Sequence, residues 1–264
     1  MRTYVLILGL ILSFKATAWE DCGTDRHNNI ANCEYQIIDG TLILRGTNGI
    51  GNIGDWANVN TPWRNQSIQN IVIESSIKDL GGQGFAYITS DKIEIPYGIT
   101  NISFDAFKWV QTREVIVPET VTRIDALAFA GSTIEKLVIP DCVESIGTAA
   151  LYATTNLTTL VIGDHTSLGS IFSYDGSMAD TTNLKIYCSG DTAKCDANLE
   201  AAGYPEFKSI KATTKKINGV AYIYDTSGKL ITTSGKRTEK RIYTLDEANA
   251  VTKPTGNTVR IKYR

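Results

Sequence analysis

The chain has 264 residues, of which 42% are hydrophobic, a proportion that is ordinary for a soluble globular protein. Its 26 basic and 28 acidic residues give a net charge of −2, and nothing in the sequence indicates a nucleic-acid-binding fold. Beyond the first 18 residues no stretch is apolar enough to cross a membrane as a helix. This length suits one elongated domain with appendages, or two domains.

Residues 1–18 have the features of a secretory signal peptide. Arg2 gives a positive start, residues 4–14 form an apolar core too short to span a bilayer, and Ala16 and Ala18 supply the small residues before a cleavage site. The alternatives are a buried N-terminal strand and a membrane anchor. We therefore expect an exported chain that is secreted, held at the cell surface or retained in the periplasm, with no transmembrane segment once it is mature.

Residues 19–69 predict an N-terminal cap. Two apolar runs within residues 35–44 flank an Asp-Gly pair, which is typical of a β-hairpin with a type I′ turn. Trp56 and Trp63 follow in a looser segment. We interpret them as a plug for the open end of a repeat array; the alternative is a pair of exposed, sugar-holding rings.

A short pattern then recurs in tandem from residue 71 to residue 187. Each copy opens with an apolar-x-apolar triplet, and the first five triplets end 22, 22, 22 and 23 residues apart. Further apolar residues follow four and seven positions later, and a small-then-large pair closes the phrase. A fixed period of this size predicts a solenoid. The first five triplets are Ile71–Ile73, Ile93–Ile95, Val115–Val117, Leu137–Ile139 and Leu160–Ile162.

One strand and one return segment fit in each period, so successive strands should stack in parallel, in about five to six rungs. The large residue of the closing pair, such as Phe107 or Phe129, should fill the axis. No rung can bury its apolar side alone, but stacked rungs can. We assign residues 70–204 to this solenoid and its C-terminal cap.

The phrases Val115–Phe129 and Leu137–Leu151 resemble the BspA-type leucine-rich repeat. That family is common in bacterial and protozoan surface proteins. The resemblance implies a leucine-rich-repeat solenoid and a secreted, non-catalytic binding protein or adhesin. It implies no particular ligand, because repeat arrays bind many things.

Residues 205–264 predict a small basic α+β module in the order β-β-α-β. A hairpin is expected over residues 220–232, a capping box at Thr244 should open a helix through about Val251, and residues 258–264 alternate as a last strand. The module has 13 basic and 5 acidic residues, net +8, whereas residues 1–204 carry −10. It could dock on the acidic body, bind an anionic envelope component or present a solvated basic face.

Export favours disulfides. Cys22 and Cys33 enclose a short polar loop near the mature N-terminus, and Cys188 and Cys195 flank the last, degraded rung. We expect both pairs to be bonded and Cys142 to be left over. The spacings do not match those of zinc sites.

The outward side of the triplets is the candidate binding face. Strand side chains alternate, so the middle residue of each triplet should point away from the core. An apolar column results, and three large apolar residues in adjacent rungs should not face water without a cover. The candidate residues are Glu94, Glu114, Ile116, Lys136, Val138, Val161 and Lys185.

Two covers fit this column. Either the basic C-terminal module folds back over it, or a partner binds there. We expect an open face that binds a partner, because solenoids usually bind along an extended surface.

Catalysis has little support in the sequence. His27 and His165 are the only histidines, neither lies in a nucleophile-elbow context, and no phosphate loop or zinc-protease motif occurs. We predict no enzyme activity, cofactor or metal, and a protein or host-surface macromolecule as partner. The alternatives are a glycan-binding module, with Trp56, Trp63 and Tyr174 on one groove, and an envelope protein anchored or sorted by residues 205–264.

Overall fold

The computed structural model describes residues 18–47, 51–56, 61–217 and 220–235, and two short strands at 244–245 and 251–252. The chain forms two units, one of residues 19–238 and one of residues 1–18 with 239–264, and each is considered by itself. The predicted signal peptide and the predicted strand over residues 258–264 lie outside the described residues.

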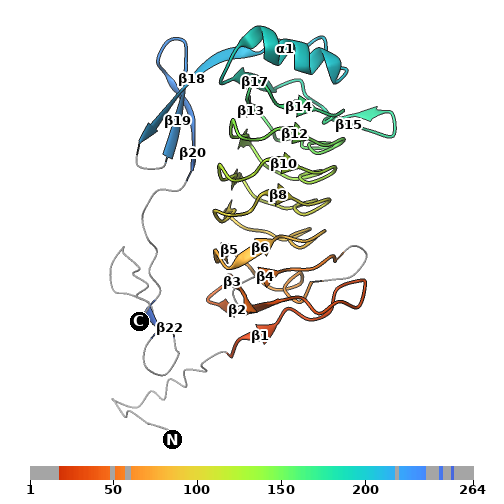
Figure 1. Ribbon diagram of the computed structural model, residues 1–264, viewed down its shortest axis with the longest axis vertical. Coiled ribbons are helices and arrows are strands. Elements are labelled where there is room, and N and C mark those ends of the chain that lie inside the picture. Colours follow the sequence, from red (N-terminus) through yellow and green to blue (C-terminus); the bar gives the residue numbers. More distant parts are fainter. Residues whose placement is uncertain are drawn as a thin grey trace, which may run out of the picture. The chain divides into compact units, whose positions relative to one another are not determined.

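Residues 19–238 form the predicted solenoid, with its strands stacked as rungs (Figure 1). Its first series of strands carries the triplets. Neighbouring strands from β7 to β17 are paired in parallel, and β3 pairs in parallel with β5. The series comprises β3 (Thr41–Gly46), β5 (Asn70–Ile73), β7 (Lys92–Glu94), β9 (Glu114–Ile116), β11 (Lys136–Val138), β13 (Thr159–Ile162) and β17 (Lys185–Cys188).

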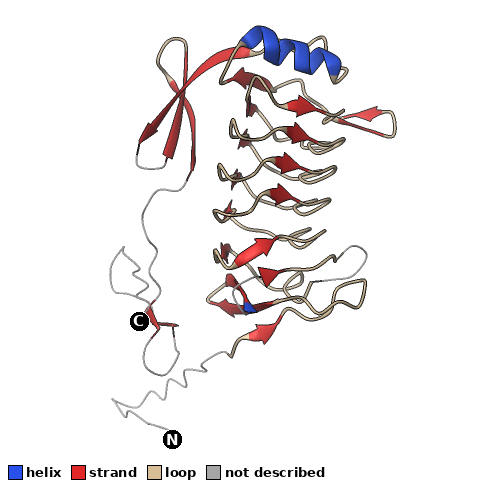
Figure 2. Cartoon of the chain, viewed as in Figure 1, coloured by secondary structure: helices blue, strands red, loops and turns tan. Residues whose placement is uncertain are grey.

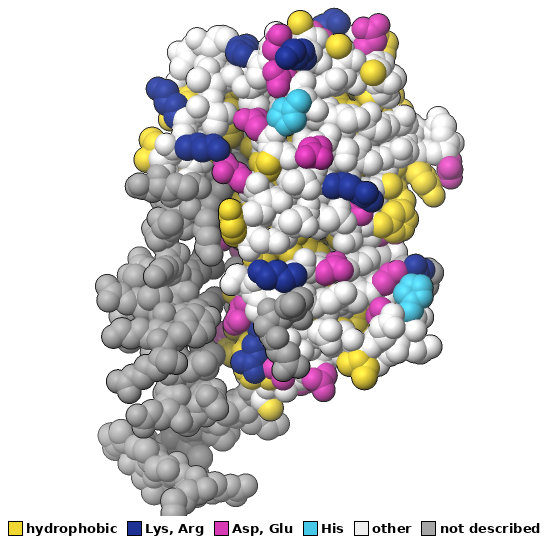
Figure 3. All heavy atoms as spheres, viewed as in Figure 1, with side chains coloured by type: hydrophobic (Ala, Val, Ile, Leu, Met, Phe, Trp, Pro, Cys, Tyr) yellow, Lys and Arg dark blue, Asp and Glu magenta, His cyan; other side chains and the backbone are white. Residues whose placement is uncertain are grey.

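A second series of shorter strands makes the adjoining side of the solenoid (Figure 2). Three of these strands contain the apolar residue seven positions after a triplet, namely Ile102, Ile124 and Ile146, which the sequence placed toward the axis but not in a strand. The series comprises β4 (Gly51–Asn52), β6 (Ile77–Asp79), β8 (Asn101–Ile102), β10 (Arg123–Ile124), β12 (Ser145–Ile146) and β14 (Ser167–Leu168). On the face in view, Lys and Arg side chains are interspersed with Asp and Glu side chains (Figure 3).

The interior is the predicted apolar axis. Phe85, Phe107 and Phe129 have no exposed surface, and their rings stack with centroids 5.2 and 5.5 Å apart. The turns that carry these rings are joined from rung to rung by backbone hydrogen bonds, such as Phe107 N to Ala128 O at 2.8 Å. The turns that carry the small-then-large pairs therefore form a ladder of backbone hydrogen bonds, and their large residues also fill the core.

The N-terminal cap contains the predicted hairpin. Strand β1 (Glu20–Asp21) pairs with β2 (Cys33–Ile38), and β2 pairs antiparallel with β3. Asp39 and Gly40 between them have φ of 47° and 72°, as a type I′ turn requires. Trp56 and Trp63 are both buried.

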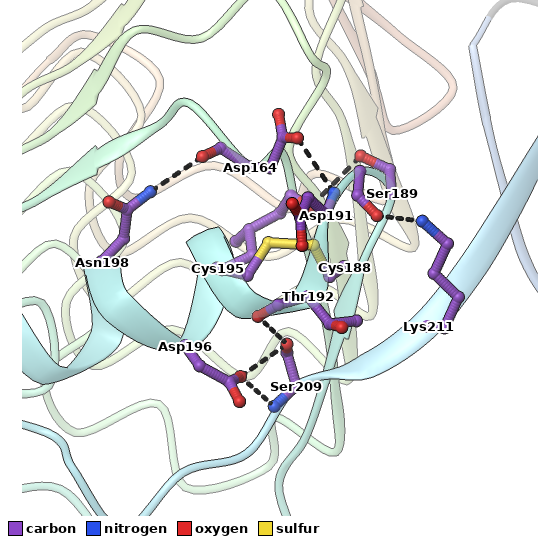
Figure 4. Close-up of a disulfide and its surroundings, with 12 residues drawn as sticks. Asp164, Cys188, Ser189, Asp191, Thr192, Cys195, Asp196, Asn198, Ser209 and Lys211 are labelled. Atoms are coloured by element: carbon purple, nitrogen blue, oxygen red, sulfur yellow. Dashed lines mark hydrogen bonds between the residues drawn. A yellow bond between two sulfur atoms is a disulfide. The ribbon is translucent and has the colours of Figure 1, made fainter.

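The C-terminal cap is the helix α1 (Thr192–Ala201), which the sequence did not lead us to expect. Asp191 caps it by accepting a hydrogen bond from Ala193 N at 3.0 Å. Figure 4 shows how the disulfide between Cys188 of β17 and Cys195 of α1 ties the helix to the last rung. Only Cys195 and Leu199 of the helix are buried, so its apolar signal is too short to stand out.

Two carboxylates fix this cap from either side (Figure 4). Asp164 accepts from the backbone N–H of Asp191 at 2.9 Å, and this bond lowers the pKa of the Asp164 carboxyl. Asp196 accepts from the hydroxyl of Ser209 at 2.7 Å, which lowers the Asp196 pKa. Both bonds favour the charged forms of these groups. In the preceding rung, β15 (Ser173–Tyr174) and β16 (Ser177–Met178) form a small hairpin.

The chain then returns along the solenoid. Strand β18 (Ile210–Ile217) pairs in parallel with β17 through its first two residues and then antiparallel with β19 (Val220–Asp225). Strand β19 pairs antiparallel with β20 (Leu230–Gly235). The hairpin predicted over residues 220–232 is confirmed, and it belongs to a three-strand sheet, here called the return sheet.

The predicted helix from Thr244 is wrong where the structure describes it. Thr244–Leu245 is strand β21, and it pairs antiparallel with Val251–Thr252, strand β22. A helix of about eight residues with one capping box is marginal without packing partners, so the capping signal alone could not decide the structure.

Candidate functional site

The first strand series presents two outward columns. Lys92 lies opposite Glu114, and Glu114 opposite Lys136, as predicted. In the second column Ile116 lies opposite Val138, and Val138 opposite Val161. The structure thus brings the candidate residues of β7, β9, β11 and β13 onto one face.

Lys185 is the exception. It lies opposite Thr159 and continues the Lys136 column, whereas Tyr187 lies opposite Val161. The last repeat is longer than the others, and its pairing shifts by two residues relative to the predicted triplet. Lys185 is therefore not the polar end of the apolar column, which the half-buried Tyr187 continues.

The expectation that the apolar column is open is wrong. Ile116 and Val161 are buried and Val138 is half-buried, and the return sheet packs on the C-terminal part of the column. Val161 is 1% exposed and forms a small apolar cluster with Ala212 of β18 and Ile223 of β19. Further side chains pack against this cluster, namely Val138, Tyr187, Ala221 and Ile231. Figure 1 shows the return sheet alongside the first strand series.

An ion pair connects the return sheet to the rungs farther down. Lys216 of β18 binds the carboxylate of Glu119, which lies in the turn after β9. This bond is the main reason that the pKa of Lys216 is raised above its ordinary value. Both side chains remain more than half exposed, so the pair contributes little to stability.

A hollow of about 290 Å³ remains where the return sheet meets the N-terminal half of the face. Lys92 forms ion pairs with Glu94 at 3.4 Å and with Glu114 at 3.6 Å. Two carboxylates therefore share one ammonium group, and the hollow is acidic. Its lining comprises Lys92, Glu94, Glu114, Ile116, Val220, Tyr222 and Thr233.

Sequence reasoning found one wall of this hollow and missed the other. Glu94, Glu114 and Ile116 were candidates, and Lys92 was recognised as part of the charged column. Val220 and Tyr222 were assigned to a hairpin whose folding back over the column was the cover we did not favour, and Thr233 lay just beyond the predicted hairpin. Their alternating apolar pattern indicated a half-buried strand, but no local signal says which surface such a strand covers.

The sugar-binding groove with Trp56, Trp63 and Tyr174 is not formed. Trp56 and Trp63 pack edge to face with ring centroids 6.3 Å apart. Their indole N–H groups donate to the backbone, to Ile53 O at 2.6 Å and to Gly84 O at 3.0 Å. They plug the end of the solenoid, while Tyr174 is exposed on β15.

The two histidines lie on the surface in different rungs. His27 Nε2 is 3.3 Å from Asp55, and His165 Nδ1 is 3.4 Å from Asp164. Among the residues that the structure describes, no group of three His, Cys, Asp or Glu side chains is arranged to hold a metal ion. In the same residues, no helix has both the length and the apolar character needed to cross a membrane.

The structure bonds the cysteines in the pairs expected from the sequence. Cys22 is bonded to Cys33 and Cys188 to Cys195, with Cα atoms 5.5 and 6.2 Å apart. Cys142 is free and half-buried. Burial raises the pKa of its thiol, so it is not an activated nucleophile.

Stacked parallel strands, an interior ladder of small-then-large pairs and capped ends together define a leucine-rich-repeat solenoid. Residues 60–178 are a BspA type leucine rich repeat region, with six copies of the repeat. Proteins with this repeat are typically secreted or displayed at the surface, and they are generally non-catalytic. No curated protein matches the chain at a significant level.

Three solved bacterial structures resemble the chain. A leucine-rich repeat protein from Eubacterium ventriosum is 19% identical, with a TM-score of 0.47 over 74% of this chain and 46% of that one. The pneumococcal vaccine antigen PcpA is 13% identical, with 0.36 over 74% and 52%. A leucine rich cell surface protein from Faecalibacterium prausnitzii is 17% identical, with 0.33 over 76% and 60%. The chain thus spans about half the length of these proteins.

Proposed function

We propose that this protein is a secreted or surface-displayed binding protein that performs no chemistry of its own. Its partner is a protein at a cell or host surface, and the binding site is the acidic hollow of the strand face. The observation that carries the proposal is the hollow itself, which has two carboxylates, one ammonium and an apolar floor at Ile116.

The chemistry of the hollow favours a basic ligand side chain. Glu94 is exposed and Glu114 half-buried, and among the residues that the structure describes Lys92 is the cation that pairs with both. A Lys or Arg of the partner would neutralise the remaining charge, and its aliphatic stem would pack against Ile116 and Tyr222. Exposed charges of this kind act mainly on the association rate and on partner choice.

The test uses the mature chain, residues 19–264, labelled with a fluorophore. Saturable binding is measured to intact cells and to immobilised collagen, fibronectin and laminin. Glu94→Lys with Glu114→Lys should weaken binding at least tenfold, and raising the salt concentration should weaken it for the wild type. Glu144→Lys is the matched control, because Glu144 is an exposed glutamate that precedes β12 and lies outside the hollow.

Equal binding by the double variant and the control would contradict the proposed site. If the wild type bound none of these surfaces, the proposed function itself would be wrong. Export has a separate test: the N-terminus of the exported protein should be Trp19, and recovery of Met1 would contradict the predicted cleavage.

Anchoring by the basic C-terminal segment is the weaker alternative. Residues 210–235 of that segment pair with the last rung and pack on the repeats. Fractionation of cells that express residues 1–235 would distinguish anchoring from binding through the strand face. If residues 236–264 anchor the protein, their removal should move it from the envelope to the medium.

A further inference from the structure

The turns that follow the second strand series lie on the side of the solenoid away from the return sheet (Figure 1). They carry the exposed rings of Tyr87, Phe104 and Trp109. Within residues 61–172 every exposed large hydrophobic side chain is aromatic, and none is aliphatic. They are Tyr87, Tyr97, Phe104 and Trp109. Hydrophobic side chains gather along this edge of the molecule in Figure 3.

Two of these exposed rings, Tyr87 and Trp109, are continued in later rungs by the half-buried Tyr152 and by the exposed Tyr174 of β15, and the four together are here called the aromatic ridge. Backbone bonds between rungs fix its order: Tyr87 N donates to Lys108 O at 3.0 Å, beside Trp109. The rings of Tyr152 and Tyr174 are 5.6 Å apart.

Gly131 lies in the rung between those of Trp109 and Tyr152, and it connects the two halves of the aromatic ridge. Gly131 N donates to Tyr152 O at 2.7 Å, and Trp109 N donates to Ala130 O at 2.7 Å. A Cβ atom at Gly131 would stand only 2.3 Å from Cε3 of Trp109. The indole of Trp109 therefore lies across Gly131 and bridges the rung that has no ring of its own.

The fold does not require rings at these positions. Tyr87 and Trp109 have φ of 63° and 56°, in the left-handed region where bulky residues are uncommon. At the equivalent positions of the next two rungs the chain has Gly131 and Ala153, with φ of 68° and 56°. Smaller residues thus satisfy the turn, yet Trp109 is 44% exposed. The left-handed conformation recurs in these turns from rung to rung, so the turn does not account for an exposed ring at Trp109.

Polar groups accompany the rings. The guanidinium of Arg64 lies 4.0 Å from the centre of the Tyr87 ring. Lys108, the residue before Trp109, forms an ion pair with Asp105 at 3.1 Å. Arg64 covers one face of the Tyr87 ring. The exposed parts of the rings, with hydrogen-bonding groups beside them, suit a ligand that is apolar on one face and polar at its edges.

We propose that the aromatic ridge binds an extended polysaccharide of pyranose sugars. A pyranose has a face of C–H groups that packs on an aromatic ring, and hydroxyls at its rim that reach polar side chains. The rungs repeat every ~4.8 Å, close to the length that one sugar adds to an extended β-linked chain. A site for a protein partner would more commonly include aliphatic anchors, and within residues 61–172 the exposed large hydrophobic side chains are all aromatic; Met178, beside Tyr174 in the β15–β16 hairpin, is the exposed non-aromatic residue next to the ridge.

The ridge extends the proposed binding role to a second surface, so the two proposals can fail separately. The probes are β-1,4-linked hexaoses of glucose, N-acetylglucosamine, mannose and xylose, the matching disaccharides, and a proline decamer as a flat apolar peptide. Tryptophan fluorescence reports the site, because Trp109 is the one exposed tryptophan of the four. At least one hexaose should change the emission saturably and bind at least tenfold more tightly than its disaccharide.

Trp109→Ala should weaken that binding at least tenfold. Gly131→Ala should weaken it about threefold or more without removing a ring, because its Cβ displaces the indole, and Ala153 shows that the backbone accepts alanine there. Tyr97→Ala is the matched control, since Tyr97 is an exposed ring off the ridge, and it should bind like the wild type.

Several results would overturn the proposal: no response to any hexaose, equal loss in the Tyr97 control, or saturable binding of the proline decamer alone. Glycan binding that persists in Glu94→Lys with Glu114→Lys would show that the ridge acts independently of the acidic hollow.

Discussion

The two halves of the strand face have the same backbone arrangement, but the return sheet packs on only one of them. In the C-terminal half, β11, β13 and β17 present Val138, Val161 and Tyr187 to the return sheet, which packs on them. In the N-terminal half, β7 presents Glu94 to solvent, and Ile116 of β9 is the floor of a hollow. From β7 to β13 the outward column passes from the exposed Glu94 to Ile116, Val138 and Val161, which are buried or half-buried.

This difference shows that an outward position in a solenoid has no fixed role. The same alternation places Glu94 and Val161 on the outside, yet Val161 is as buried as a core residue. Its partner lies more than 50 residues later in the chain, in Ala212 and Ile223. The repeat sets which side chains point outward, and a segment outside the repeat decides whether they meet water.

The largest expected effect concerns the interior that both halves share. Phe107→Ala and Phe129→Ala should each lower the free energy of unfolding by about 3–5 kcal/mol, because each removes a fully buried ring from the stack. Denaturant titration measures both. Phe107 lies in the rung of β7 and Phe129 in that of β9, both in the N-terminal half, so nearly equal losses are expected. A loss below about 1 kcal/mol for either would contradict the observed packing.

Val161→Asp should disrupt the packing of the return sheet on the covered half of the strand face. It removes a buried aliphatic side chain and places a charge between the two sheets, at a cost of about 2–4 kcal/mol. Limited proteolysis should then release the return sheet. Glu94→Gln is the control for the open half, and an exposed change of this kind should stay within about 0.5 kcal/mol. Equal stability of the two variants would mean that the cover does not hold the column.

The smallest effect concerns the ion pair of Lys216 and Glu119. The folded-state pKa of Lys216 is raised above 10.5, so the pair stabilises the fold fully below pH 10.5. That contribution should be lost as the pH rises through the folded-state pKa. Because the pair is exposed, we expect less than about 1 kcal/mol. The pH dependence of melting above pH 10 measures it, and Lys216→Met should remove the extra slope. An unchanged slope in that variant would assign the dependence to other groups.

The repeats could be predicted from sequence, because their signals are local and repeated. Each triplet, closing pair and turn adds the same evidence again, and Phe107 and Phe129 lie where the period places them. The type I′ turn at Asp39 and Gly40 was equally local. Single, short signals were less reliable. The capping box at Thr244 predicted a helix where the structure has β21, and α1 went unnoticed because it buries only two residues.

The candidate site was predictable only in part, for the same reason. The columns through Glu94, Glu114 and Ile116 follow from the two-residue period of a strand. Lys185 was misplaced because the last repeat is longer, and only the pairing with β13 reveals the shift. Three residues of the aromatic ridge, Tyr87, Trp109 and Tyr174, could have been found by extending the repeat alignment two residues past each closing pair. Tyr152 lies one residue earlier in its rung and would have required the structure.

The sequence by itself determined the solenoid, its axis, its outward columns and the pairing of its cysteines, since each depends on spacing along the chain. Only the tertiary structure decided which outward residues are covered. The return sheet is built from residues 210–235, and nothing local in Val161 or Ile223 specifies their contact. The physical reason is that apolar burial is non-directional. An outward valine and an amphipathic strand each require an apolar cover, but neither sequence specifies which surface provides it.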